Sequence, residues 1–324
     1  MFEPCIQGSL DGKCDRGLVL VDNASCFDPV KPVSDIGQFV LGDHVCNCFY
    51  KSTLTILLAM PVRFYVQDSR IREVFEKAVR LVDKVGVVDS CDVVVYDYPE
   101  VLMSVSGLAD GLLFRRETPP ECVTIIEPRK AYFVYLSTTE LTYAMHAVGH
   151  LVIDYLSGVE SVTFDCRGLD PFKREIDMVA VWFLQNLLQD VIVDVYVSKH
   201  VYDRYRDHLR RVLEDARSSM CIFTSSTVGR AVWVAVSRAS AKIYRMLLER
   251  RLDPVLAQVW EKVDSIKNTY DLAELMDLVY RNEVLPEIEK EIRQFGIRIV
   301  NARVGVEYDQ IVNIRLIMKM PHEP

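Results

Sequence analysis

The chain is 324 residues long, with half of its residues hydrophobic and 26% charged, which is enough to bury a substantial core in one or two domains. Acidic residues outnumber basic ones by 46 to 38, and the formal net charge at pH 7 is −8. Nucleic-acid binding needs a basic face, and the chain has no long basic run. We therefore expect no nucleic-acid partner.

The N-terminal residues do not form a basic segment followed by an apolar run, so the sequence predicts no secretory signal. The most apolar stretch, residues 54–60, stops at Pro61 and is too short to span a membrane. We therefore expect a cytoplasmic protein without a membrane partner. The scarcity of Asn (seven) and Gln (eight) is typical of thermophilic proteins.

Residues 1–50 form an irregular N-terminal segment rich in Gly, Asp, Pro and Cys. It holds five of the nine cysteines: Cys5, Cys14, Cys26, Cys46 and Cys48. Their spacing does not match the paired C-x-x-C of common zinc sites. Buried thiols, with or without one disulfide, are the favoured interpretation, and a small structural metal site is the alternative.

Residues 51–195 have the pattern of a mixed α/β region. We expect a helix from Asp68 to Val85, where apolar residues recur at helical spacing. A helix with two histidines comes later, followed by a loop over 157–171 and a second long helix from about Phe172 that continues past Asp194. The predicted strands cover residues 54–66, 92–97, 101–105, 112–115, 122–126 and 131–136.

Residues 196–324 are mostly helical by periodicity. The Val- and Ile-rich tail, residues 296–320, predicts a β-hairpin with its turn near residues 307–309. No internal repeat or low-complexity tract is present in the sequence. The predicted helices cover residues 201–217, 222–251, 254–267 and 271–295.

The most informative stretch, residues 137–156, contains His146 and His150. Thr138 and Glu140 belong to a capping signal that precedes an apolar periodic run, so we expect a helix here. Residues four apart lie on the same face of a helix, which lets both imidazoles bind one metal ion.

This motif, His146-Ala147-Val148-Gly149-His150, resembles the H-E-x-x-H zinc helix of the zincin metallopeptidases, in which the Glu is the general base. The resemblance covers about residues 120–195. It implies an α+β fold, with a zincin-like core of a mixed sheet plus the metal-binding helix, followed by the mostly helical C-terminal half and its terminal hairpin. It also implies one zinc ion, a peptide or protein substrate or partner, and a strand within 122–136 that borders the cleft.

A tetrahedral zinc site needs a third protein ligand, and the gluzincin branch of this family takes a Glu from the next helix. By that resemblance Glu175, which follows His150 by 25 residues, is the first choice. Asp190 and Asp194 are the alternatives, because residues 186–194 are similar to an N-x-x-E-D segment of other HExxH proteins.

Asp154 and Asp177 are expected to orient the metal ligands rather than to bind the ion. Each candidate also has an ordinary explanation. Two histidines on an amphipathic helix can be half-buried and hydrogen-bonded, and single carboxylates on helices are commonly solvated.

Ala147 stands where the family has its general base. A methyl group cannot transfer a proton, and general acid–base help contributes about 10²–10⁴ in rate. The Ala is either an engineered knock-out or the native residue of a pseudo-peptidase. We therefore expect a zinc metallopeptidase-like protein that is catalytically impaired. The alternative is a non-enzymatic intracellular interaction or scaffold protein with a helical binding surface over about residues 195–295.

Overall fold

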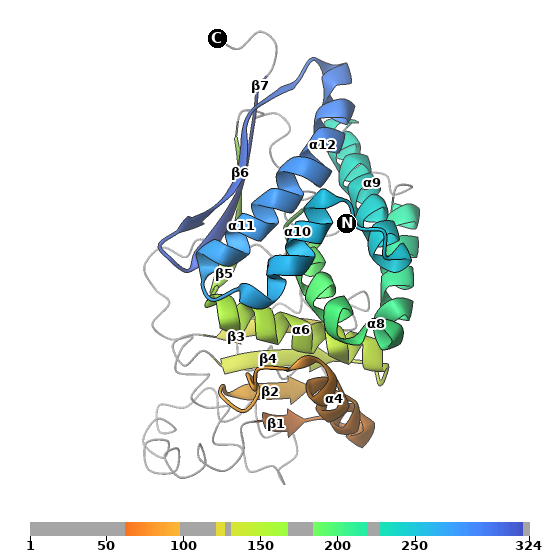
Figure 1. The fold of residues 1–324 in the computed structure, drawn as a ribbon. Coiled ribbons are helices and arrows are strands. Elements are labelled where there is room, and N and C mark those ends of the chain that lie inside the picture. Colours follow the sequence, from red (N-terminus) through yellow and green to blue (C-terminus); the bar gives the residue numbers. More distant parts are fainter. Residues whose placement is uncertain (1–61, 98–120, 127–130, 168–183, 220–226, 320–324) are drawn as a thin grey trace. The chain divides into compact units, whose positions relative to one another are not determined.

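The computed structural model describes residues 62–97, 121–126, 131–167, 184–219 and 227–319 (Figure 1). Within these ranges the chain has an α+β fold that is mostly helical and contains two small sheets. Two compact units are formed by Met1–Leu151 and Val152–Pro324. The division falls inside α6 (Leu141–Ser157), whose backbone continues from one unit into the next.

The first unit contains a four-stranded sheet in the order β1-β2-β4-β3 (Figure 1). The three strands β1, β2 and β4 are parallel, and β3 runs antiparallel to β4. Strand β2 is buried along its whole length, as a central strand of a parallel sheet should be. The strands are β1 (Val62–Tyr65), β2 (Val93–Tyr96), β3 (Glu121–Ile126) and β4 (Ala131–Leu136).

Helix α4 (Ser69–Val82) connects β1 to β2 and confirms the helix predicted over 68–85. Its N-cap is Asp68, whose carboxylate accepts a hydrogen bond from the backbone N–H of Arg70 at 3.0 Å. The stripe of apolar side chains predicted from the sequence is the buried face of the helix, and its buried members are Ile71, Phe75, Ala78 and Val82.

The strand that comes directly before α6 is β4, and it is paired on both sides, by β2 and by β3. An extended peptide could therefore not add to β4. Strand β3 lies at the edge of the described sheet, so it is the member of the predicted pair that could accept another strand.

Helix α6 begins after Thr138, whose hydroxyl accepts a hydrogen bond from the backbone N–H of Glu140 at 3.2 Å. A helix that is apolar on every side belongs in the interior of a protein. Helix α6 fits this rule, because it has buried residues on all its faces: Ala144, Met145, Ala147, Val148, Leu151, Val152 and Ile153. The histidine pair is therefore carried by a core helix.

The second unit contains a three-stranded sheet in the order β5-β7-β6. Strands β6 (Arg298–Glu307) and β7 (Ile311–Lys319) form the predicted C-terminal hairpin. The loop predicted over 157–171 is wrong at β5 (Ser161–Arg167), which pairs in parallel with β7. The partner that stabilises this strand lies about 150 residues later in the chain. The glycines near residues 157–171 predicted a loop and gave no sign of this pairing.

The helices of the second unit agree with the periodicity of the sequence. Helix α8 packs against α9, α9 packs against α12, and α11 packs against β6 (Figure 1). The predicted helix over 271–295 is two α-helices, α11 and α12, joined by a π-helical turn, Tyr280–Val284, and followed by a short 3-10 turn, Arg293–Phe295. The helices are α8 (Asn186–Ser219), α9 (Thr227–Glu249), α10 (Pro254–Lys262), α11 (Thr269–Val279) and α12 (Leu285–Ile292).

Helix α8 is sharply bent at Val201, where φ is −143° and ψ is 34°. In a straight helix Asp194 and Tyr205 would be about 16 Å apart along the axis. Instead, the Tyr205 hydroxyl donates a hydrogen bond to the Asp194 carboxylate. The two arms of α8 therefore fold back on each other, and the second arm matches the helix predicted from about residue 201.

Val201→Pro should prevent this bend. Proline requires φ near −65°, and it also lacks the backbone N–H, so the two arms could not keep their geometry. We expect the free energy of unfolding, measured by urea denaturation, to fall by about 3 kcal/mol or more. Val201→Ala leaves the backbone angles accessible and is the control, with an expected loss of about 1 kcal/mol. Equal stability of the two variants would argue against a bend at this residue.

Candidate metal centre

His146 and His150 face each other on α6. Their Nε2 atoms are 3.1 Å apart, and the two rings meet edge to face with centroids separated by 4.7 Å. Two nitrogens bound to one tetrahedral zinc at about 2.05 Å each would lie about 3.3 Å apart. The observed spacing fits a shared ion, and it equally fits one N–H···N hydrogen bond between neutral imidazoles.

The most buried acidic side chain in this region is Asp194, with no exposed surface. The Tyr205 hydroxyl donates to its Oδ1, and the Tyr244 hydroxyl donates to its Oδ2 at 2.7 Å. The Nε2 of His208 lies 3.5 Å from Oδ1. Asp194, Tyr205 and His208 are on α8, and Tyr244 is on α9. One carboxylate therefore joins both arms of α8 to the next helix.

Burial of a carboxylate is costly unless hydrogen bonds replace its lost water, and the two phenols provide them. Burial, and then the charges of Asp194 and Asp190, raise the pKa of Tyr244 well above its usual value. Tyr244 therefore stays protonated and acts as a donor at neutral pH. The His208 ring stacks on Tyr205, with centroids 4.6 Å apart and an interplanar angle of 18°.

Asp194 and His208, which both belong to the second unit and are both buried, bring a carboxylate oxygen and an imidazole nitrogen within 3.5 Å of each other. The histidine pair of α6 offers two imidazole nitrogens 3.1 Å apart. Imidazole nitrogens and carboxylate oxygens form donor sets that suit zinc.

Only some of the predicted site residues lie in the part of the chain that the structure describes. The first choice for third ligand, Glu175, and its neighbour Asp177 lie outside the described residues, so both roles stay predictions. The two alternatives, Asp190 and Asp194, lie on the first arm of α8, and their role as third ligand also stays a prediction.

Asp154 lies two turns after His146 on α6 and is buried. Its carboxylate accepts a hydrogen bond from the Gln189 side chain at 3.0 Å. It thus links α6 to α8 through a side-chain amide. Its predicted part in orienting the histidines stays a prediction.

His208 was not predicted from the sequence. It follows Asp194 by 14 residues, which corresponds to about 21 Å along a straight helix. Its apolar neighbours Tyr205 and Leu209 indicate a buried helix face, but a buried histidine on such a face is more often a packing residue. The bend at Val201, which has no strong signal in the sequence, brings His208 to Asp194.

Ala147, at the position of the missing base, is completely buried. Its helix neighbours Ala144, Val148 and Leu151 are also completely buried. An apolar side chain therefore fits this position well, and a carboxylate here would have to be accommodated inside the core.

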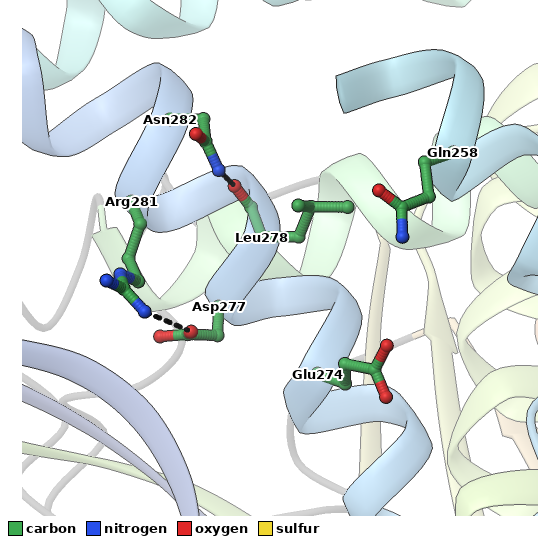
Figure 2. Close-up of a pocket in the computed structure, with 6 residues that line it drawn as sticks. All are labelled: Gln258, Glu274, Asp277, Leu278, Arg281 and Asn282. Atoms are coloured by element: carbon green, nitrogen blue, oxygen red, sulfur yellow. Dashed lines mark hydrogen bonds and ion pairs between the residues drawn. The ribbon is translucent and has the colours of Figure 1, made fainter. Parts of the chain in front are cut away.

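A hollow of about 290 Å³ lies elsewhere in the second unit, beside α10 and α11 (Figure 2). Its charged groups already have partners: Asp277 accepts from the Val304 N–H at 2.7 Å, and Glu274 pairs with Lys262 at 2.8 Å. This hollow offers no group that needs a ligand. Its lining residues are Gln258, Glu274, Asp277, Leu278, Arg281 and Asn282.

The five N-terminal cysteines lie outside the described residues, so neither interpretation of them is tested. Cys91 is a free, half-buried thiol. Burial raises the pKa of the Cys91 thiol to about 12, with further contributions from the negative charges of Asp83 and Asp92. This thiol is therefore neutral at physiological pH and is neither a nucleophile nor a ready metal ligand.

Comparisons with protein-family models, with curated proteins and with solved structures found no match to this chain. The resemblance to zincins therefore remains one of motif and spacing. Among the described helices, none combines the length and the apolar character that a membrane span requires.

Ala147→Glu should destabilise the protein. The new carboxylate would enter a position without solvent access, so we expect the free energy of unfolding to fall by about 3 kcal/mol or more. Ala147→Gly, which only loosens the helix, should cost about 1 kcal/mol. Urea denaturation measures both. A stable Ala147→Glu protein that hydrolyses an unstructured peptide would instead identify the Ala as a knock-out of an active enzyme.

Proposed function

We propose that this chain is a zinc-binding, zincin-like protein that holds a metal ion at His146 and does not hydrolyse peptides efficiently. The observation that supports this most directly is the histidine pair, whose Nε2 atoms lie 3.1 Å apart on a core helix, with His146 only 6% exposed. Converging imidazoles are uncommon in a core, where polar groups otherwise cost stability.

The donor set favours zinc among the common ions. Imidazole suits zinc, copper, iron and nickel, whereas magnesium and calcium prefer oxygen ligands throughout. Zinc accepts four ligands in a tetrahedral arrangement and takes nitrogen and carboxylate oxygen together. Two imidazoles and one carboxylate would leave one position for a further ligand.

A bound zinc ion would polarise a carbonyl group and lower the pKa of a coordinated water. Hydrolysis also needs a residue that takes the proton of that water and delivers it to the leaving amine. Ala147 can do neither, and its burial leaves no space in which another group could take over from that position. We therefore assign the centre to binding and to stability rather than to catalysis.

The burial of His146 agrees with this assignment, because a substrate would have little access to an ion bound there. Binding of an ion at such a site adds directly to the stability of the folded state. The partner class is a peptide or protein, and edge strand β3 is where an extended segment could pair.

Three ligand sets share the histidine pair and differ in the third ligand, which is Glu175, Asp190 or Asp194. Each set has one residue that the other two lack, so single substitutions separate the three.

Purified protein should contain about one equivalent of zinc by elemental analysis, and His146→Ala should abolish it in every ligand set. If Asp194 is the third ligand, Asp194→Ala should lower the zinc affinity strongly, since one of three protein ligands is lost. Asp190→Ala and Glu175→Ala are the matched controls and should leave the affinity within a few-fold of the original. Competition with a chromophoric chelator measures each affinity.

The midpoint temperature of thermal unfolding provides a second test of the same proposal. Removal of zinc with EDTA should lower it, since an ion present at 1,000 times its dissociation constant stabilises by about 4 kcal/mol. A midpoint that EDTA does not change, in a protein that contains no zinc, contradicts the proposal. It would favour the interaction or scaffold protein with a helical binding surface.

A further inference from the structure

We propose that Glu283 and Asp253 share one proton, and that loss of this proton as the pH rises releases the N-terminal end of α10 from the π-helical turn Tyr280–Val284. Asp253 is the N-cap of α10, and Glu283 lies on the π-helical turn between α11 and α12. Both residues belong to the second unit. Neither is a candidate metal ligand, so the pair works with or without a bound ion.

Glu283 is an acid in a position that does not suit a free negative charge. It is only 4% exposed. Its Oε2 lies 2.7 Å from the Nζ of Lys242 on α9, but this ionic contact is not aligned as a hydrogen bond, and no described residue donates one to Oε2. A buried carboxylate is costly unless hydrogen bonds replace its lost water. The position therefore favours the protonated acid.

Asp253 provides the second carboxyl group. Its Oδ1 accepts a hydrogen bond from the Leu256 N–H at 2.9 Å, and its carboxyl group also lies within hydrogen-bonding reach of that of Glu283. A hydrogen bond between two carboxyl groups needs a proton on one of them, because ionised carboxylates can only accept. With one proton, the two carboxyl groups and the Lys242 ammonium carry no net charge. Without it, they carry one negative charge in a largely buried place.

The direction of the pKa shift agrees with this geometry. Burial raises the pKa of Glu283, and the neighbouring Asp253 raises it further, while Lys242 opposes the rise. The folded protein therefore holds the proton more tightly than the unfolded chain does. The stability that this proton contributes is complete below the ordinary pKa of a glutamic acid, and it is lost as the pH rises through the raised pKa.

The surrounding charges do not replace the proton. The charged groups that act on Glu283 are Asp253 and Lys242, and Lys242 is also attracted by Glu287 of α12. Arg238 of α9 is already bound by two carboxylates of α12, at 3.4 Å and 2.5 Å. Helix α11 and strand β6 also contact the π-helical turn, but the Asp277 carboxylate of α11 accepts a backbone N–H of β6.

The pair joins two segments that line the hollow described above. Gln258 lines it from α10, and Asn282 lines it from the π-helical turn (Figure 2). The other end of α10 is held to α8, where Lys199 donates to the Trp260 carbonyl at 2.6 Å and pairs with Asp264 at 2.7 Å. Loss of the proton would therefore free one end of α10, leave the other fixed, and widen the hollow.

Amide hydrogen exchange of the full-length protein, corrected for the intrinsic rate at each pH, tests this proposal. As the pH is raised from about 4 to about 8, we expect the protection of the α10 amides to fall about tenfold for each unit by which the pKa of Glu283 is raised. Glu283→Gln keeps the shape of the side chain and cannot ionise, so its α10 protection should stay constant over this range. Equal pH profiles in the two proteins would overturn the proposal.

Glu289→Gln is the matched control, because Glu289 is an exposed residue of α12, and this variant should keep the original pH dependence. Asp253→Asn is a second test, since asparagine caps a helix about as well as aspartate and cannot lose a proton. It should also remove the pH dependence, and it answers the question by itself if Glu283→Gln does not fold. A loss of protection that is the same at every pH would identify a merely structural contact and contradict the shared proton.

Discussion

The buried carboxylate of Asp194 organises the helical part of this protein. A charge without solvent access is tolerable only with close partners, and here two phenol hydroxyls and an imidazole surround it. These partners come from the second arm of α8 and from α9. The need to satisfy one carboxylate therefore favours the packing in which α8 bends and α9 lies against it.

The bend at Val201 has a direct consequence for chemistry. It converts residues that would be far apart on one helix into neighbours, and it places His208 beside Asp194. A buried carboxylate oxygen and a buried imidazole nitrogen thus lie 3.5 Å apart.

The same burial explains how binding and hydrolysis can be separated in one motif. The histidines need only a common direction, which the i, i+4 spacing of a helix ensures. Hydrolysis needs in addition a proton acceptor with access to the reacting water. Ala147 is packed among apolar neighbours, so the first requirement can be met where the second is not.

The sequence predicted helices and strands correctly where hydrophobic periodicity and the end signals of an element agree. Helix α4, with Asp68 at its N-cap and a buried apolar stripe, is one example, and the C-terminal hairpin is another. Strand β5 was missed because it depends on β7, about 150 residues later in the chain. Glu175 was chosen from a family spacing, and it lies outside the residues that the structure describes.

The sequence by itself determined the histidine pair and its helix, because a spacing of four residues is a local property of the backbone. It also placed Asp190 and Asp194 on the following helix as candidates. Only the tertiary structure decided that His208, Tyr205 and Tyr244 meet Asp194. The reason is physical: these contacts join residues 11 to 50 positions apart, and they form only once a helix has bent and a second helix has packed against it.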